Sequence, residues 1–259
     1  MTLLRAARSL LSVLLVGLYF VLASPVLRLL VLPGAWLFPS QRFRLVSLYM
    51  KGMSYGIEAL LTFGGARFRQ AGTIPTAEPV LVVANHQSLV DILQMTIMSR
   101  PRVPGYVTRS RYGRFVPLVS ACVRLLGGPL IDPRSDPRGA VREIRQAAER
   151  LPHGLMIFPE GHRSTDGAIR PFRTSGIEAI LAARRLPVYL VLNEGVWRVR
   201  RFTDLLFRVH LIDAVSEASG PYEPPADLAA LPAFAHELRE KLVARLAELR
   251  RQNTSAGAA

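Results

Sequence analysis

Apolar runs and amphipathic stretches alternate along the chain from about residue 66 onward. Continuous apolar runs rich in β-branched residues are the pattern of strands buried on both faces. Such runs lie within residues 78–85, 155–161 and 186–195. Shorter apolar segments predict additional strands at residues 105–110, 129–132 and 207–215.

Helical patterns fill the intervals between these predicted strands, at residues 88–99, 114–128, 135–154 and 172–185. The helix within 135–154 has the clearest start, with Asp136 as a candidate N-cap and Pro137 at the first helical position. The helix within 114–128 is expected to begin or kink near Pro117. Strands that alternate with helices of this length predict an α/β fold with a mostly parallel central sheet flanked by helices.

The N-terminal region has a different pattern, because residues 10–23 are apolar on every side. Ser24-Pro25 separates them from a second apolar run at residues 26–38, and no acidic residue precedes Glu58. Three interpretations compete: a cleaved signal peptide, a transmembrane helix, and two helices in one leaflet that turn at Ser24-Pro25. Membrane attachment is favoured over cleavage, because a signal peptide has no need of the second apolar run.

These patterns divide the chain into three parts. Residues 1–60 are expected to form hydrophobic membrane-associating helices, and residues 61–220 the α/β domain. Residues 221–259 are expected to contain a proline-rich linker, an amphipathic helix at 234–251 and a frayed tail at 253–259.

The formal net charge of +14 predicts a polyanionic partner, which is a nucleic acid, an anionic membrane or a phosphate-bearing substrate. Aromatic-plus-basic motifs of RNA-binding proteins and zinc-ligand spacings are absent from the sequence, so neither a nucleic-acid partner nor a metal site is expected. Cys122 is the single cysteine, which excludes a disulfide within the chain.

Polar residues interrupt the first buried run where it ends, at Asn85-His86, and Asp91 follows five residues after the histidine. We expect Ser88 to be an N-cap and Asp91 to be the third helical residue, in a capping-box arrangement. Such a turn brings the carboxylate within reach of the imidazole, where it fixes the tautomer of a general base. The alternative is that Asp91 only caps the helix and His86 is a polar loop residue.

Two other predicted strands also end in polar residues. Residues 158–164, Phe-Pro-Glu-Gly-His-Arg-Ser, form a turn in which Arg163 offers a planar guanidinium suited to phosphate. Asp132 and Arg134 follow the short strand at residues 129–132. Because the carboxyl ends of parallel strands meet at one edge of a sheet, these residues are expected to share an edge with His86.

With these motifs in this order, the chain resembles the glycerolipid acyltransferases, a family typified by lysophosphatidate acyltransferase. The first family motif is an Asn-His pair followed by four residues and an aspartate, and it is matched by Asn85, His86 and Asp91. The third family motif is matched by Phe158, Pro159, Glu160, Gly161, Arg163 and Ser164. His162 stands where the family commonly has threonine.

The remaining resemblance is weaker. The second family motif is matched only by Gly128, Ile131 and Asp132, since Pro133 replaces its arginine and Arg134 comes one residue late. Leu186-Pro187-Val188 resembles the fourth motif, and Arg109 and Arg173 resemble two basic positions of the family.

The resemblance implies an O-acyltransferase that moves a fatty acyl group from a thioester donor, acyl-CoA or acyl carrier protein, to the hydroxyl of 1-acyl-glycerol-3-phosphate. His86 and Asp91 would form the catalytic pair, and Glu160, Gly161 and Arg163 the acceptor-phosphate site. Weaker candidates for phosphate or donor binding are Asn85, Arg109, Asp132, Arg134, His162, Ser164 and Arg173. The resemblance implies no cofactor and no metal.

Two alternatives remain open at the level of sequence. One is an acyltransferase that uses another lyso-lipid acceptor, such as lyso-ornithine lipid, or that needs no CoA. The other is a basic membrane-binding protein without turnover. In every case the expected location is the inner or cytoplasmic membrane, and an enzyme would have its active site on the cytoplasmic side.

Overall fold

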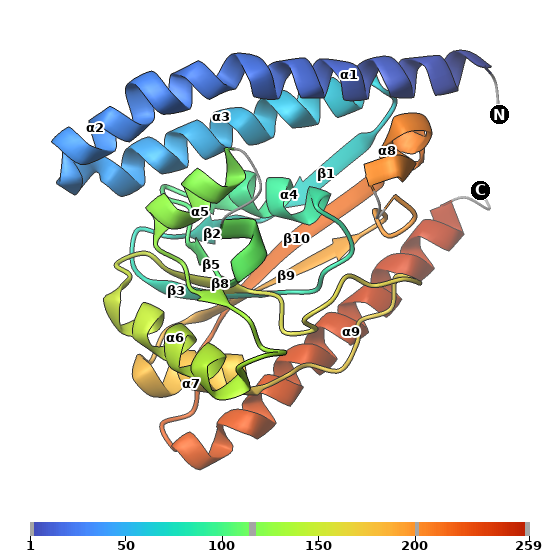
Figure 1. Cartoon of the computed structure of the whole chain (residues 1–259). Coiled ribbons are helices and arrows are strands. Elements are labelled where there is room, and N and C mark those ends of the chain that lie inside the picture. The colour runs from blue at the N-terminus through green and yellow to red at the C-terminus, as the bar shows by residue number, and fades with distance from the viewer. Residues whose placement is uncertain (1–2, 114–117, 200–201, 257–259) are drawn as a thin grey trace.

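A six-stranded sheet forms the centre of the computed structural model, which describes residues 3–113, 118–199 and 202–256 (Figure 1). The strand order is β1-β10-β9-β3-β8-β5, with β9, β3, β8 and β5 mutually parallel and β10 and β1 running the opposite way. The bounds are β1 (Arg67–Ala71), β10 (Asp213–Tyr222), β9 (Val188–Glu194), β3 (Val80–Ala84), β8 (Gly154–Ile157) and β5 (Gly105–Tyr106). The predicted α/β fold with a mostly parallel sheet is therefore confirmed.

Two short strand pairs lie outside this sheet. β2 (Ile74–Pro75) pairs with β4 (Ser99–Arg100), and β6 (Thr108–Arg109) pairs with β7 (Leu130–Ile131). The prediction of a single strand at residues 105–110 is therefore wrong. The segment contains two short strands, of which β5 belongs to the central sheet and β6 pairs with β7.

Helices cover both faces of the central sheet (Figure 1). One face is covered by α6 (Pro137–Arg150), α7 (Ser175–Ala183) and α9 (Leu231–Ala256). The other is covered by α4 (Val90–Met98) and α5 (Val119–Leu126), with α3 (Arg42–Phe63) and α1 (Leu3–Val26) outside them. The N-cap of α6 is Asp136, as predicted, and its carboxylate accepts a hydrogen bond from Gly139 N at 2.7 Å.

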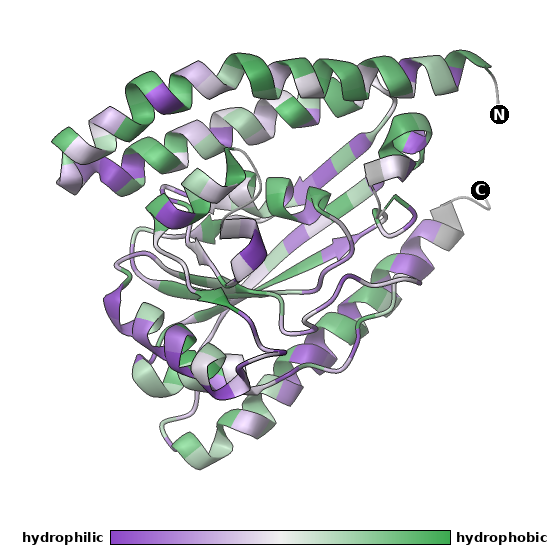
Figure 2. Cartoon of the chain, in the orientation of Figure 1, coloured by the Kyte–Doolittle hydropathy of each residue, from purple (hydrophilic) through white to green (hydrophobic). Residues whose placement is uncertain are grey.

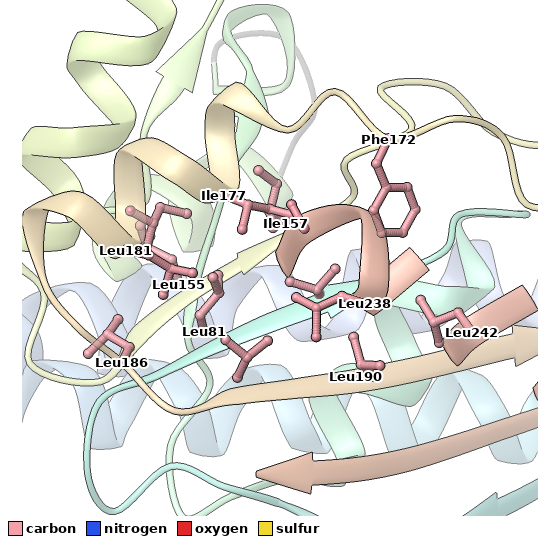
Figure 3. Packing of buried hydrophobic residues seen from close by; sticks show 14 of the residues in the cluster. Leu81, Leu155, Ile157, Phe172, Ile177, Leu181, Leu186, Leu190, Leu238 and Leu242 are labelled. Atoms are coloured by element: carbon pink, nitrogen blue, oxygen red, sulfur yellow. The ribbon is translucent and has the colours of Figure 1, made fainter. Parts of the chain in front are cut away.

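The continuous apolar runs are explained by burial of the central strands on both faces. Leu81 of β3 and Leu155 of β8 point toward α6, α7 and α9 (Figure 3), and Val82 and Met156 pack on the opposite side. All four side chains are fully buried. This core holds the carboxyl ends of β3 and β8, and the turns that follow them, in fixed relative positions.

The N-terminal helix does not turn at Ser24-Pro25, which contradicts the turn assumed in one of the three interpretations, that of two helices in one leaflet. The chain stays helical through η1 (Leu27–Val31), a π-helical turn, and through α2 (Leu32–Leu37). Proline removes one hydrogen-bond donor from a helix, and a π-helical turn directly after it absorbs that irregularity. The reversal comes at η2 (Pro39–Gln41), from which α3 runs back alongside α1 (Figure 1).

Small residues let α1 and α3 pack closely. Ser9 and Ser12 are fully buried, and the Tyr19 ring lies where a side chain at Gly56 would be. The outer face of α1 is exposed and apolar, as Figure 2 shows, through Leu4, Leu11, Leu14, Leu18, Val21 and Leu22. By length and composition the helix over Leu3–Leu37 is sufficient to cross a membrane, and only 22% of its most apolar window is buried.

Two further predictions about elements need correction, and a third falls partly outside the described residues. Residues 207–212 lie in α8 (Phe202–Arg208), in η4 (Val209–Leu211) and in the link to β10, so the strand predicted at 207–215 begins only at Asp213. Helix α5 begins at Val119, and Pro117 lies outside the described residues. Residues 253–256, predicted to fray, belong to α9, and the rest of that tail lies outside the described residues.

Candidate active site

The imidazole of His86 and the carboxylate of Asp91 form a hydrogen-bonded pair at the carboxyl end of β3. His86 Nδ1 lies 2.8 Å from Asp91 Oδ2, and the side chains are 16% and 0% exposed. With Asp91 ionised, Nδ1 carries the proton, because a carboxylate only accepts hydrogen bonds. The other ring nitrogen, Nε2, is then unprotonated and able to accept a proton from a substrate.

Asp91 reaches His86 through a turn that differs from the predicted capping box. The N-cap of α4 is Leu89, so Asp91 is the second helical residue and Ser88 lies before the cap. The same Oδ2 atom accepts hydrogen bonds from Gln87 N at 2.6 Å and Ser88 N at 2.8 Å. Ser88 Oγ instead donates to Val199 O at 3.1 Å. Asp91 therefore closes the turn before the helix and holds the imidazole with the same atom.

The turn after β8 fixes the backbone of His86 on both sides. Glu160 Oε1 accepts a hydrogen bond from His86 N at 2.8 Å, and Ser164 N donates to His86 O at 2.7 Å. The Phe158 ring stacks on the imidazole, with ring centroids 4.1 Å apart and an interplanar angle of 24°. The first and third motifs, about 75 residues apart, thus form one rigid unit around His86.

Glu160 faces the protein interior. The residue is 4% exposed, and its other oxygen accepts a hydrogen bond from Arg170 N at 2.9 Å. Burial raises the pKa of Glu160, and the backbone N–H groups of Arg170 and His86 oppose that shift. Both oxygens accept hydrogen bonds from backbone amides, so Glu160 shapes the turn and does not itself contact a substrate phosphate.

Asn85 is also engaged within the protein. Its Nδ2 donates to Asn193 O at 2.8 Å and its Oδ1 accepts from Asn193 N at 2.7 Å. Asn193 Nδ2 returns a bond to Asn85 O at 3.1 Å. Both residues are 1% exposed, so Asn85 joins the end of β3 to β9 instead of facing a ligand.

A cluster of cations lies beside this unit. Arg109 Nη2, at the end of β6, lies 2.8 Å from Gly161 O and 3.0 Å from His162 Nδ1. The Arg173 side chain packs against Gly161, which has a φ of +69° that favours glycine. Burial lowers the pKa of His162, and the positive charges of Arg109, Arg173, Arg134 and Arg170 lower it further.

The structure thus brings together four sequence-predicted residues: Arg109, Arg134, His162 and Arg173. Arg163 is half-buried on the same turn. Asp132 is exposed, and its hydrogen bonds with Ser135 and with Arg134 N lower the pKa of its carboxyl, so it closes a turn. Ser164 is buried, with its hydroxyl bonded to Asp166 Oδ1 at 3.0 Å, and it supports the turn from within.

Sequence reasoning missed the polar network behind His86. Gln87 Nε2 donates to Glu194 Oε2 at 2.7 Å, and Glu194 Oε1 pairs with Arg250 of α9 at 2.9 Å. No local sequence signal predicts the roles of Gln87 and Asn193, because their partners are more than 100 residues distant in the chain.

Chemically, the site combines a proton acceptor with a cationic cluster that suits a substrate phosphate. Within the described residues, no group of three or more His, Cys, Asp or Glu side chains is arranged to hold a metal ion. The arrangement is therefore suited to proton transfer from a hydroxyl group on an anionic substrate.

Comparisons with known proteins find similarity to acyltransferases. The model of the Acyltransferase family matches residues 65–192. The 1-acyl-sn-glycerol-3-phosphate acyltransferase BAT2 of Brassica napus chloroplasts is 31% identical over 130 residues, which are 49% of this chain and 36% of that protein. The enzyme of the same general name from Haemophilus influenzae is 24% identical over 173 residues, 65% of this chain and 70% of that protein.

The fold is shared with a solved structure. The crystal structure of the 1-acyl-sn-glycerophosphate acyltransferase PlsC from Thermotoga maritima matches with a TM-score of 0.66 and 23% sequence identity. The match covers 90% of this chain and 96% of that one. The plant relative is much longer, since the matched segment spans about a third of its length.

Proposed function

From the match of residues 65–192 to the model of the Acyltransferase family, we propose that the protein is a 1-acyl-glycerol-3-phosphate O-acyltransferase. It transfers a fatty acyl group from an acyl thioester to the free hydroxyl of the acceptor and forms phosphatidate. The observation that carries this proposal is the 2.8 Å contact between His86 Nδ1 and Asp91, beside the turn that contains Arg163.

The proposed reaction is a direct transfer. The acceptor oxygen attacks the thioester carbon while its proton passes to His86 Nε2, and Asp91 stabilises the imidazolium that forms. The tetrahedral intermediate then breaks its carbon–sulfur bond, and the imidazolium returns the proton to the departing thiolate. A positioned general base contributes about 10²- to 10⁴-fold to the rate. No covalent acyl-enzyme is needed, because the attacking hydroxyl belongs to the substrate and the histidine only accepts its proton.

The proposed acceptor-phosphate site consists of Arg163 and the cations near it. Arg109, Arg134 and Arg173 supply guanidinium groups that bind phosphate through paired N–H donors. Glu160 acts indirectly by fixing the turn through backbone amides. Acyl-CoA or acyl–acyl carrier protein serves as the donor, and either would bring phosphate groups to the same basic surface.

A second acceptor class is kept because this chain departs from the family motifs at two positions. Pro133 stands in place of an arginine, and His162 stands in place of the usual threonine beside Arg109. Another lysophospholipid, or lyso-ornithine lipid, would then accept the acyl group through the same His86 chemistry.

The proposed location is the cytoplasmic membrane, with the active site on its cytoplasmic side. Support comes from the exposed apolar face of α1 and from the packing of α1 along α3, which keeps the helix beside the domain. A long acyl chain exposed to water costs about 0.8 kcal/mol per methylene. An enzyme that lies on the membrane receives its acceptor without that cost.

A product assay tests the proposal. Purified full-length protein is incubated with labelled acyl-CoA or labelled acyl–acyl carrier protein as the donor. In separate reactions, each donor is combined with 1-acyl-glycerol-3-phosphate, another lysophospholipid or lyso-ornithine lipid as the acceptor. The expected result is that 1-acyl-glycerol-3-phosphate is labelled fastest and yields labelled phosphatidate. Faster labelling of a different lyso-lipid would replace the acceptor, and the absence of a labelled product with every donor and acceptor would contradict acyl transfer.

A further inference from the structure

A second basic site lies away from His86, where the start of α1, the end of α3 and η4 meet the first residues of β1 and β10. The structure has a hollow there of about 520 Å³. We call it the N-terminal basic hollow. It is lined by Arg5, Arg8, Thr62, Gly64, Gly65, Ala66, Arg67, His210, Ile212 and Asp213.

The hollow exists because three elements approach closely at a pair of glycines. A side chain at Gly64 would place its Cβ 2.7 Å from Ser12 and from Val209. Gly65 has a φ of +105° and turns the chain away from α3 toward β1. Ser9, which is fully buried, fixes one wall through a 3.3 Å contact between its hydroxyl and His210 Nδ1.

The charges in the hollow are predominantly positive. Arg5, Arg8 and Arg67 contribute three guanidinium groups, and His210 contributes an imidazole. Arg5 and Arg67 form no hydrogen bond or ion pair through their side chains with the rest of the described residues, and both are exposed. One N–H of Arg8 donates a hydrogen bond to Phe63 O at 2.7 Å. Five N–H donors on each guanidinium leave most of this donor capacity for a ligand.

Among the described residues that line the hollow, the carboxylate of Asp213 does not offset this charge. Asp213 is paired with Arg69 at 3.2 Å, and both side chains are 52% exposed. Burial and the nearby charge of Arg5 lower the pKa of His210. The lining of the hollow is therefore cationic and suited to an anion.

The position of the hollow indicates where that anion comes from. It lies at the end of the exposed apolar face of α1, where Leu4 is 70% exposed and Leu11 is 46% exposed. Phosphate groups of lipids lie at the level where such an apolar face gives way to basic residues. The hollow shares the edge of the sheet used by His86, but β1 is three strand positions from β3, about 14 Å at the usual spacing.

We propose that the N-terminal basic hollow binds the phosphate group of an anionic membrane lipid, separately from the active site. Arg5 and Arg67 hold the phosphate oxygens, with Arg8 and His210 behind them. The lipid's acyl chains lie along the apolar face of α1. This inference does not depend on acyl transfer, because none of these residues contacts the His86 unit through a hydrogen bond or ion pair within the described part of the chain.

The test follows the ring resonances of His210 in the full chain, solubilised in an uncharged detergent and assigned with His210→Gln. The probes are dihexanoyl phosphatidylglycerol, dihexanoyl phosphatidylcholine and inorganic phosphate, each at constant ionic strength. We expect saturable binding of the phosphatidylglycerol that raises the pKa of His210, since an anion favours the imidazolium. Binding of each of the other probes should be at least about tenfold weaker.

Two double variants with the same loss of charge make the test specific. Arg5→Gln with Arg67→Gln should weaken binding at least about tenfold, since each basic residue near an anionic surface contributes about a factor of five. Arg142→Gln with Arg145→Gln, on the exposed face of α6, should leave binding unchanged. Unaltered His210 resonances, or equal binding by the two variants, would overturn the site. Inorganic phosphate that binds as tightly as the lipid would overturn the lipid as its source.

Discussion

At the scale of residues, two buried carboxylates form hydrogen bonds with His86. Asp91 accepts the imidazole N–H and two backbone N–H groups with one oxygen. Glu160 accepts the backbone N–H of His86 itself. Together with the stacked Phe158 ring, these contacts fix the imidazole in position and orientation, which a general base requires before substrate arrives.

His162 should make acceptor binding depend on pH. Its pKa is lowered by burial and by the cations Arg109, Arg173, Arg134 and Arg170, so it is neutral near pH 7 in the free protein. A bound phosphate offsets those cations and raises the pKa, so binding takes up a proton and strengthens as pH falls. We expect KM for the acceptor to fall several-fold between pH 8 and pH 6.

The control for this effect is His162→Thr, which lacks the titrating group. Its KM should follow only the ionisation of the phosphate itself, whose second pKa is about 6. A wild-type pH profile of KM that superimposes on the profile of His162→Thr would contradict a role for this imidazole in acceptor binding.

Some of this residue-level arrangement was predictable, and some was not. The approach of Asp91 to His86 follows from their spacing at a strand-to-helix turn, although Ser88 is not the cap. The contact between Glu160 and His86 N depends on which strands are neighbours. The pairing of Asn85 with Asn193 does too, because β3 and β9 lie side by side.

At the scale of elements, the position of His86 depends on the junction of β3, β8 and β9. The strands are predictable because burial on both faces demands uninterrupted apolar runs. The segment at residues 207–212 was predicted incorrectly because a short apolar run has no reliable period, and its buried Val209 serves a helical turn against α1. The run beyond Pro25 stays helical because a π-helical turn absorbs the proline, which no local pattern indicates.

Asn193→Ala should weaken the connection between β9 and the turn that carries His86. It removes the Nδ2 donor to Asn85 O and the Oδ1 acceptor for the Ser216 hydroxyl. Leaving these buried groups without their partner costs about 1–3 kcal/mol in the free energy of unfolding. We expect a lower thermal midpoint and a lower kcat with little change in KM. Ser216→Ala, which removes a single 2.8 Å bond to Asn193 Oδ1, should have the smaller effect on kcat. Equal kcat values for wild type and Asn193→Ala would show that this clamp does not position the base.

His153, just before β8, should make the packing of α3 sensitive to acid. Its ring is fully buried against Phe43, with centroids 4.3 Å apart, and burial lowers its pKa to about 4. The unfolded chain takes up this proton near pH 6.5 while the folded chain does not, so stability falls between about pH 6.5 and pH 4. The full effect is about 3 kcal/mol.

His153→Phe keeps an aromatic ring at this position and removes the titrating group. The variant should lose less of its thermal midpoint than wild type when the pH is lowered from 7 to 4.5. An identical acid-induced loss in the two proteins would place the sensitivity elsewhere.

At the scale of the whole molecule, an apolar helix and a positively charged domain are suited to the same partner, a lipid membrane. The exposed face of α1 is suited to the lipid interior, and the net charge of +14 is suited to its phosphate groups. Because α1 packs against α3 and α8, attachment to a membrane through α1 would hold the domain in a defined orientation.

Leu14→Glu with Leu18→Glu should abolish binding to anionic lipid vesicles and leave the fold intact. Leu14 and Leu18 are 61% and 52% exposed, so the charges cost little in the free protein and a great deal in lipid. A sedimentation assay measures the bound fraction. Leu228→Glu is the control and should bind as wild type, because Leu228 is 58% exposed and lies just before α9, which covers the opposite face of the sheet. Retained binding by the double variant would contradict attachment through α1.

The most direct test of the central claim is the steady-state rate of acceptor-dependent CoA release by His86→Ala. We expect kcat to fall by about 10²- to 10⁴-fold while KM for the acceptor changes little, because the cationic cluster is intact. His236→Ala, an exposed histidine on α9, is the matched control and should keep the wild-type rate. A kcat for His86→Ala within a few-fold of wild type would contradict general-base catalysis by this residue.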